Sequence, residues 1–272
     1  MNGVEKMKAI VVVPTYNERQ NLEHLVARIR QAAPGLHILI VDDNSPDGTG
    51  WIADHLSRQN PGAVFVLHRQ KKEGLGRAYV AGFDWVLQDS YDVVVQMDGD
   101  LSHDPAYLPM MLAAIQDCDL VLGSRYLRGI AVVNWDFKRL LLSKLATKYV
   151  QLVTRLPFTD ATGGFKCWRR RTLESVGLEE IFSDGYVFQI EMSYKAHRQG
   201  LRIAEVPIVF YERDFGRSKM NWRIIWEAFW GVLRLKLAHS WRSTRSAPPL
   251  PASLLRLPAA RRHASPSPGL PL

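Results

Sequence analysis

The first half of the chain alternates short apolar segments with longer amphipathic ones. Apolar runs bounded by polar residues, typical of strands buried on both faces, occur at 9–14, 37–42, 63–68, 92–97 and 120–124. Between them, apolar side chains recur every three or four residues, as in helices that bury one face, at 21–33, 49–59, 76–88 and 106–116. Strands and helices alternating in this way predict an α/β fold with a Rossmann-like, mostly parallel sheet flanked by helices.

The pattern becomes less regular in the second half of the chain. The spacing predicts a long basic amphipathic helix at 134–155, a glycine-rich turn at 160–166 and a helix at 185–200. The segment 201–214 is predicted to be extended, and Pro207 places it at a sheet edge or a break.

A further amphipathic helix is predicted at 221–239. Its large apolar side chains gather on one side and are Trp222, Trp226, Phe229, Trp230 and Leu233. A helix of this kind can lie in the interface of a bilayer or pack against the domain, and the pattern is compatible with both.

Positive charge is concentrated at the end of the chain. The formal net charge is +8, and the segment 236–272 holds six Lys or Arg residues and no acid. Residues 240–272 are dominated by Pro, Ser, Ala and Arg, which predicts a disordered basic tail after one globular domain at 1–239. A basic tail could be attracted to nucleic acid or to anionic lipid, but a solvated tail is the simpler interpretation, and we expect no nucleic-acid partner.

Cysteine usage and hydropathy bear on the compartment. The only two cysteines, Cys118 and Cys167, lack metal-ligand spacing, which favours a reducing environment. The N-terminal apolar run is too short for a signal peptide, and no stretch reaches the roughly 18 uninterrupted apolar residues of a spanning helix. We therefore expect a cytoplasmic location.

Acidic residues follow several of the predicted strands. The strand ends read PTYNE at 14–18, VDDNSPDGTG at 41–50 and MDGDLSHD at 97–104. Because parallel strands end at one edge of the sheet, these groups should meet there. Asp98 and Asp100 flank Gly99, so their carboxylates can converge while the glycine lets a ligand approach the backbone. Paired carboxylates predict Mg²⁺ or Mn²⁺ bridged to a diphosphate.

These segments together resemble the family 2 glycosyltransferases, which have the GT-A fold. The resemblance covers about residues 8–235 and rests on VVVPTYNERQNL, ILIVDDNSPDGTG, KKEGLGRAYVAGF, VVVQMDGDLSHDP, LVLGSRY, ATGGFKCWRR, GYVFQIEM and VPIVFYERDFGRSKM. Within that family, the chain looks like the dolichol- or polyprenol-phosphate mannosyltransferases. Their common fold is therefore the expected one here, with amphipathic helices near the C-terminus.

The resemblance implies a site for a nucleotide sugar. Its nucleotide-binding residues would be Pro14, Tyr16, Glu18, Ile40, Asp42, Asp98, Gly99, Asp100, Arg125, Arg213 and Lys219. Asp98 and Asp100 would hold the metal, and Asp100 and Arg125 would be catalytic. The segment 215–220 places Gly216 and Ser218 beside two cations, and we interpret it as a mobile loop that closes on the donor diphosphate, with an exposed basic turn as the alternative. Many relatives have a glutamine metal ligand where this chain has Ser102, which puts a third protein ligand in doubt.

The acceptor side is expected to bind a lipid phosphate. Arg125, Arg139 and Ser143 would grip that phosphate, because arginine pairs strongly with phosphate oxygens. The alternative is that Arg139 belongs, with Lys138, to a solvated helix face. A phosphate acceptor would need no general base, since its second pKa is about 6 and it is already an anion at neutral pH.

The expected activity is inverting, metal-dependent transfer of mannose from GDP-mannose to a polyprenyl (dolichyl-type) monophosphate, by a peripheral enzyme at the cytoplasmic face of a membrane. One alternative is transfer of glucose or N-acetylglucosamine from a UDP-sugar to the same lipid, and another is a non-catalytic membrane adaptor. A phosphatase of the haloacid-dehalogenase type would carry its D-x-D-x-T motif on the first strand, not the fourth. An NAD-binding enzyme would show G-x-G-x-x-G after the first strand, which this chain lacks.

Overall fold

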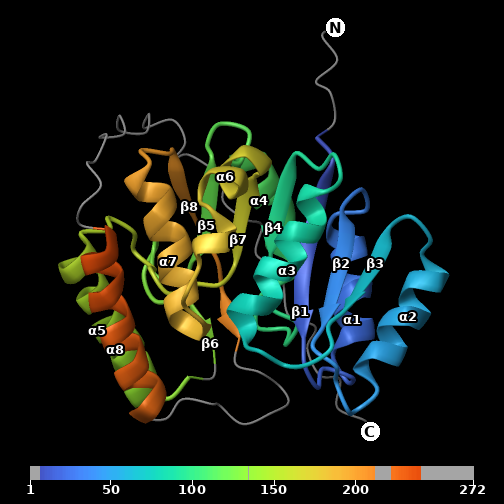
Figure 1. Cartoon of the computed structure of the whole chain (residues 1–272), viewed down its shortest axis with the longest axis horizontal. Helices are drawn as coiled ribbons and strands as arrows, with labels where there is room; N and C mark the ends of the chain where they lie inside the picture. Colours follow the sequence, from blue (N-terminus) through green and yellow to red (C-terminus); the bar gives the residue numbers. More distant parts are fainter. Residues whose placement is uncertain (1–6, 134, 212–221, 240–272) are drawn as a thin grey trace, which may run out of the picture.

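The protein is built around a central, mostly parallel sheet (Figure 1). This computed structural model describes residues 7–133, 135–211 and 222–239. The strands are β1 (Ala9–Thr15), β2 (His37–Asp42), β3 (Val64–His68), β4 (Val93–Gln96), β5 (Leu120–Ser124), β6 (Val132–Val133), β7 (Lys166–Arg169), β8 (Ile203–Pro207) and β9 (Phe210–Tyr211). The main sheet has the order β3-β2-β1-β4-β7-β5-β8, and β6 pairs with β9 in a small parallel ladder.

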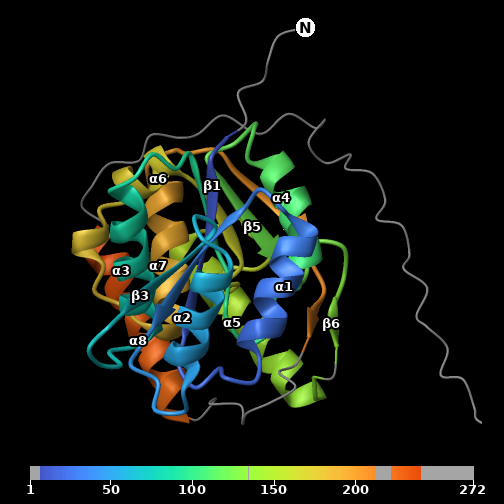
Figure 2. The ribbon, with the colours of Figure 1, turned by 90° about the vertical axis from the view of Figure 1, so that its right-hand side faces the viewer.

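Helices cover both faces of the sheet, as the alternating pattern predicts (Figure 2). They are α1 (Leu22–Ala32), α2 (Thr49–Gln59), α3 (Leu75–Leu87), α4 (Leu108–Ala114), α5 (Phe137–Thr154), α6 (Arg170–Ser175), α7 (Gly185–Arg198) and α8 (Trp222–His239), with 3₁₀ turns at Pro105–Tyr107 and Leu178–Glu180. Alternate strand residues enter different cores. Val11 and Val13 pack with α1, α2 and α4, whereas Ile10 and Val12 pack with α3, α6 and α7.

Strand β7 was missed by the sequence analysis. It runs antiparallel to both neighbours, β4 and β5, in an otherwise parallel sheet. The segment is only four residues long, KCWR, and follows the predicted glycine-rich turn directly. Its partners are far away in sequence, for example Val94 opposite Trp168, so no local periodicity marks it. The five strands expected in the first half of the chain are confirmed to within one or two residues.

The second half of the chain forms the remaining edge of the sheet. β8 is the edge strand, and Pro207 is its last residue, in agreement with the expected edge position. Helix α5 begins after Asp136, whose carboxylate accepts from the Arg139 N–H at 2.7 Å, and is slightly shorter than the predicted 134–155.

Helices α5 and α8 lie side by side beyond this edge (Figure 1). The rings of Tyr149 and Phe229 stack with centroids 4.9 Å apart, and the Tyr149 hydroxyl donates to the Phe229 carbonyl at 2.9 Å. Within the residues that the structure describes, none of the helices combines the length and apolar character needed to cross a bilayer. The predicted disordered tail, 240–272, falls outside these residues.

Candidate functional site

The strand order reverses between β1 and β4, and the carboxyl ends of these strands form the candidate site. β1 lies between β2 and β4, so the chain winds outward in both directions from this point. In sheets of this kind, ligands bind at such a reversal. Gly99 is packed tightly against β1, since a Cβ there would lie 3.0 Å from the Pro14 carbonyl oxygen. The missing side chain therefore lets the acidic turn after β4 approach the end of β1.

Asp98 is held by an uncharged donor. The Tyr79 hydroxyl, from α3, donates to Asp98 Oδ1 at 2.7 Å. Burial, and then the Asp98 carboxylate, raise the pKa of Tyr79 well above its usual value, so the phenol keeps its proton. The Asp98 N–H donates to His103 Nδ1 at 3.1 Å, which leaves the proton of a neutral imidazole on Nε2, 4.0 Å from Asp98 Oδ2.

Asp100 is held by the next turn of the chain. Leu101 has a left-handed backbone with φ of 64°, an uncommon conformation for a bulky residue. This turn brings the Ser102 N–H and hydroxyl to Asp100 Oδ1, at 3.1 and 2.5 Å. Ser102 thus orients the Asp100 carboxylate, and its hydroxyl oxygen keeps lone pairs that other groups can use.

The predicted nucleotide-side residues occupy the ends of β1 and β2. Asp42 accepts from the Ser45 hydroxyl at 2.6 Å and from its N–H at 3.1 Å. Tyr16 has the Lys72 ammonium 3.8 Å from its ring centroid, and Glu18 accepts from an asparagine of the following turn at 2.7 Å. Ile40 is completely buried in the apolar core. Two further residues of this set, Arg213 and Lys219, and the loop 215–220 lie outside the described residues.

Arg125 forms a buried ion pair that the sequence analysis missed. Its Nε and Nη2 donate to the two carboxylate oxygens of Asp160 at 2.6 and 2.7 Å, and Nη2 also donates to Thr162 at 2.8 Å. Burial opposes both charges, but each partner outweighs it: the pKa of Arg125 is raised and that of Asp160 is lowered. Glu205 in turn accepts from the N–H groups of Thr159 and Asp160, which fixes the loop that carries Asp160.

The predicted acceptor residues surround two aromatic rings. The guanidinium carbons of Arg125 and Arg139 lie 5.5 and 4.4 Å from the Trp135 ring centroid. The Tyr126 hydroxyl donates to Ser143 Oγ at 2.8 Å. Arg125, Arg139 and Ser143 therefore line one region, and Trp135 is a neighbour that the sequence analysis did not single out.

Lys166 is a buried cation between the acidic groups. Its ammonium donates to the Gln189 carbonyl at 2.5 Å, and 1% of the residue is exposed. Burial lowers the pKa of Lys166 to about 7, against the opposing effect of Asp160 and Asp98. The fold thus places a weakly basic amine within electrostatic reach of Asp160 and Asp98, although it pairs with neither of them.

The donor set of the acidic pair fits a hard divalent cation. Two carboxylates from one turn match the usual protein share of a Mg²⁺ or Mn²⁺ site, in which waters and phosphate oxygens complete the shell. No group of three or more His, Cys, Asp or Glu residues arranged for a metal occurs in the described ranges. An ion held by Asp98 and Asp100 would need waters or phosphate oxygens for its remaining positions.

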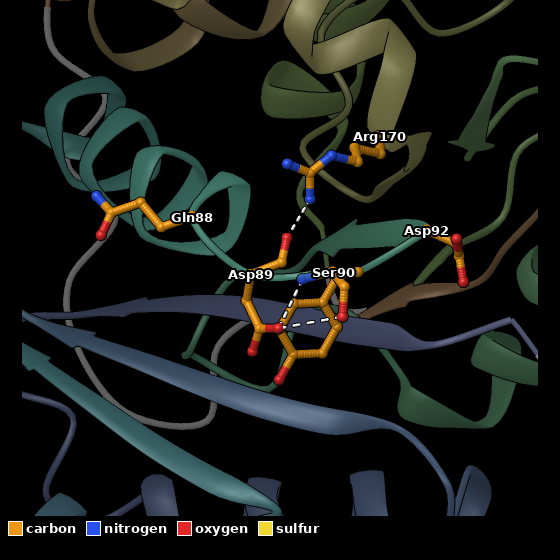
Figure 3. A pocket seen from close by; sticks show the side chains of 6 residues that line it. Gln88, Asp89, Ser90, Asp92 and Arg170 are labelled. Atoms are coloured by element: carbon orange, nitrogen blue, oxygen red, sulfur yellow. Dashed lines mark hydrogen bonds between the residues drawn. The ribbon is translucent and has the colours of Figure 1, made fainter.

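A surface hollow lies at the opposite end of β4 (Figure 3). It is lined by Gln88, Asp89, Ser90, Tyr91, Asp92 and Arg170. Its charged groups are paired: Arg170 donates to the Asp89 and Leu87 carbonyls, and Lys8 pairs with the Asp89 carboxylate at 2.9 Å. The hollow is unconnected with the strand ends that carry the acidic pair.

A doubly wound sheet with paired carboxylates at its switch point is the arrangement of a GT-A glycosyltransferase, and the protein is an enzyme of this class. The chain belongs to glycosyl transferase family 2, whose family model matches residues 10–177.

Two curated relatives are similar over most of their length. The polyprenol monophosphomannose synthase of Mycolicibacterium smegmatis is 46% identical over 231 residues, which is 83% of this chain and 87% of that protein. The undecaprenyl-phosphate mannosyltransferase of Micrococcus luteus is 45% identical over 240 residues, 88% of this chain and 98% of that protein.

Solved structures share the fold at low identity. Glucosyl-3-phosphoglycerate synthase from Mycobacterium tuberculosis, in a complex with Mn²⁺, UDP and glucosyl-3-phosphoglycerate, has a TM-score of 0.60 and 18% identity, covering 86% of this chain and 80% of that one. A mannosyltransferase from Pyrobaculum calidifontis, in complex with GDP-Man and Mn²⁺, has a TM-score of 0.57 and 20% identity. The match covers 89% of this chain and 66% of that one. The expected GT-A fold is confirmed, and the adaptor alternative is ruled out by the family.

Proposed function

We propose that the protein transfers mannose from GDP-mannose to a polyprenyl monophosphate, with inversion at the anomeric carbon. The main support is the acidic pair at the β1/β4 switch point in a chain 45–46% identical to two polyprenyl-phosphate mannosyltransferases. The neighbour from Pyrobaculum calidifontis, which binds GDP-Man and Mn²⁺, supports the donor and the metal by fold alone.

In the proposed reaction, an oxygen of the lipid phosphate bonds to the anomeric carbon while the bond from that carbon to the diphosphate breaks. The electron pair leaves with GDP, and attack from the opposite face inverts the configuration. A bound Mg²⁺ or Mn²⁺ would stabilise negative charge on the diphosphate. Asp98 and Asp100 would hold the ion, with their carboxylates oriented by Tyr79 and Ser102.

The nucleotide would lie along the neighbouring strand ends. We assign Pro14, Tyr16, Glu18, Ile40 and Asp42 to its binding, Ile40 through the shape of β2 because its side chain is buried. Gly99 would contribute close packing of the metal-binding turn. Arg213 and Lys219 remain candidates for contact with the diphosphate.

The acceptor phosphate would bind beside Arg125, Arg139 and Ser143. The Nε and Nη2 atoms of Arg125 donate to Asp160, and Nη2 also donates to Thr162. Among the residues that the structure describes, none accepts a hydrogen bond from the third nitrogen, Nη1. Arg125 would therefore give the phosphate a fixed donor with a partly neutralised charge. A phosphate that is already anionic needs no general base.

The paired helices α5 and α8 would bring this site to the membrane surface. Large apolar side chains are exposed on both helices: Phe137, Leu141, Leu145 and Leu152 on α5, and Trp226, Phe229, Trp230 and Leu237 on α8. Exposed tryptophans on an amphipathic helix favour the interfacial region of a bilayer. We propose peripheral binding at the cytoplasmic face, where the lipid headgroup could enter the site.

Vesicle binding tests the proposed membrane surface. Trp226 and Trp230 are 57% and 60% exposed, and Trp51, on α2 at the far side of the sheet, is 67% exposed. Replacing Trp226 and Trp230 together by serine should weaken sedimentation with anionic vesicles by about tenfold or more, because two interfacial anchors are lost. Trp51→Ser is the matched control, and an equal loss in the control would refute the assignment of this surface.

The donor and acceptor are tested by a transfer assay. The protein would be incubated with a short polyprenyl phosphate and labelled GDP-mannose, UDP-glucose or UDP-N-acetylglucosamine, each with Mg²⁺, Mn²⁺ or chelator. We expect metal-dependent label in the lipid from GDP-mannose alone. Label from a UDP-sugar alone would replace the proposed donor, and label that persists in chelator would refute the metal.

A further inference from the structure

A short chain of buried polar side chains lies beside the candidate site. Gln96 is the last residue of β4, Trp168 belongs to β7 and Gln189 to α7, and all three are buried. The Trp168 indole N–H donates to Gln96 Oε1 at 3.3 Å, and Gln96 Nε2 donates to Gln189 Oε1 at 2.5 Å.

The donor and acceptor of each hydrogen bond in this series follow from the chemistry of the side chains. An indole nitrogen can only donate, so Gln96 must present its oxygen to Trp168 and its amide nitrogen to Gln189. Gln189 then accepts through Oε1, and its own NH₂ group points away from Gln96. The orientation of two amides is thus set by one indole.

The NH₂ group of Gln189 faces the space beside Asp98. A Cβ on Gly164 would lie 3.4 Å from Gln189 Nε2 and 3.4 Å from Asp98 Oδ2, so the two atoms are at most about 7 Å apart. Because residue 164 has no side chain, the space between them stays open. No acceptor for this NH₂ group is found among residues 7–133, 135–211 and 222–239.

Gln189 is also fixed through its main chain. Lys166 Nζ donates to the Gln189 carbonyl at 2.5 Å, and Ser193 Oγ donates to the same oxygen at 3.2 Å. The Gln189 NH₂ group is not among the fully buried side-chain atoms that lack a partner, so water or a ligand oxygen can reach it, while the rest of the residue is buried. The Gln189 NH₂ group is therefore held in place to donate a hydrogen bond to an oxygen atom of a ligand.

We propose that the Gln189 side-chain amide donates a hydrogen bond to a hydroxyl of the sugar on the donor nucleotide, and that Trp168 and Gln96 set its direction. This inference rests on the proposed function, because the sugar is joined to the diphosphate that Asp98 and Asp100 would hold. Gln189 is then a sugar-binding residue, while Trp168 and Gln96 are positioning residues.

The test separates sugar binding from nucleotide binding. GDP and GDP-mannose would be titrated by calorimetry in Mn²⁺ into the wild type, Gln189→Met and Trp168→Phe. Met has a similar length but no donor, so Gln189→Met should weaken GDP-mannose binding by about tenfold and leave GDP binding within about twofold. Trp168→Phe keeps Gln189 but frees the amide orientation, and should weaken GDP-mannose binding by about two- to threefold.

Controls keep the outcomes distinct. Gln88→Met, at the exposed hollow of Figure 3, should change neither affinity. If Gln189→Met fails to fold in a thermal melt, Trp168→Phe carries the test. Equal losses for GDP and GDP-mannose would overturn the inference in favour of a diphosphate contact, and no loss would overturn it outright. If the wild type transfers sugar only from UDP-glucose, the proposed donor fails, and UDP with UDP-glucose replaces the pair in the same titration.

Discussion

The two ends of strand β4 carry acidic residues in very different settings. Before the strand, Asp89 lies at the surface and pairs with the Lys8 ammonium at 2.9 Å, and the Asp92 carboxylate accepts from the Lys8 N–H at 2.8 Å. After the strand, Asp98 accepts from the Tyr79 phenol, and within the described residues no Lys or Arg lies in ion-pair distance of it. The acids before β4 already have basic partners, whereas Asp98, after β4, holds a negative charge that a cation can neutralise.

The contrast separates acids that complete the fold from acids that await a ligand. Asp160, near the second end, belongs to the first kind, because Arg125 neutralises it. The hollow at the first end is also lined by acids, yet its charged groups already have partners (Figure 3). Among these acids, the charge of Asp98 that has no basic partner is therefore the guide to the site.

The largest effect is expected from Asp98→Asn and Asp100→Asn. Each replacement keeps the size of the side chain but removes a charge from the proposed metal site, so kcat/KM should fall by about 10³-fold, equivalent to about 4 kcal/mol. Steady-state transfer from GDP-mannose measures this. Retention of more than a tenth of wild-type kcat/KM in both variants would contradict the assignment.

The next effect is on stability and concerns Asp160→Asn. Removing one partner leaves the buried Arg125 charge uncompensated, which should lower the free energy of unfolding by about 3 kcal/mol. Urea unfolding would show this, with Asp98→Asn as the matched control that changes stability by no more than about 1 kcal/mol. A larger loss in Asp98→Asn than in Asp160→Asn would reverse the comparison.

A smaller, pH-dependent effect is expected at Lys166. Its folded pKa is lowered to about 7 by burial, and its unfolded pKa is about 10.4. Between these values the unfolded state binds more protons, so the stability of the wild type should rise relative to Lys166→Met by about 1.4 kcal/mol per pH unit. Below pH 7 the lysine is protonated in both states and the difference should be constant. Unfolding at pH 6, 7.5 and 9 measures it, and a flat difference from 7.5 to 9 would refute the lowered pKa.

The smallest effect is expected from Asp89→Asn. The Lys8 pair is solvent-exposed and remote from the site, so transfer activity should stay within about twofold of the wild type. A tenfold loss of kcat/KM would show that this end of β4 takes part in function.

Strand position and the acidic pair could be predicted because they depend on local sequence. Runs such as Val93, Val94 and Val95 are buried on both faces and end in Asp98, so the strand and its end are visible together. Topology then brings Pro14 and Gly99 into contact, as expected from parallel neighbours.

The rest depends on contacts between distant residues. Arg125 and Asp160 are 35 residues apart, and Gln96 and Gln189 are 93 apart. The antiparallel strand β7 carries Lys166 and lies between β4 and β5. It has no periodic signal of its own in the sequence. Without that strand, the charge balance of Arg125 and the orientation of Gln189 could not be inferred from the sequence.

The metal-bridged diphosphate is tested most directly by the binding of GDP, measured by calorimetry with Mn²⁺ and with chelator. We expect GDP to bind to the wild type and to Asp89→Asn in Mn²⁺, and to bind at least tenfold more weakly in chelator or to Asp98→Asn. Equal affinity of the wild type with and without Mn²⁺, or unchanged affinity of Asp98→Asn, would contradict a metal-bridged diphosphate at the carboxyl end of β4.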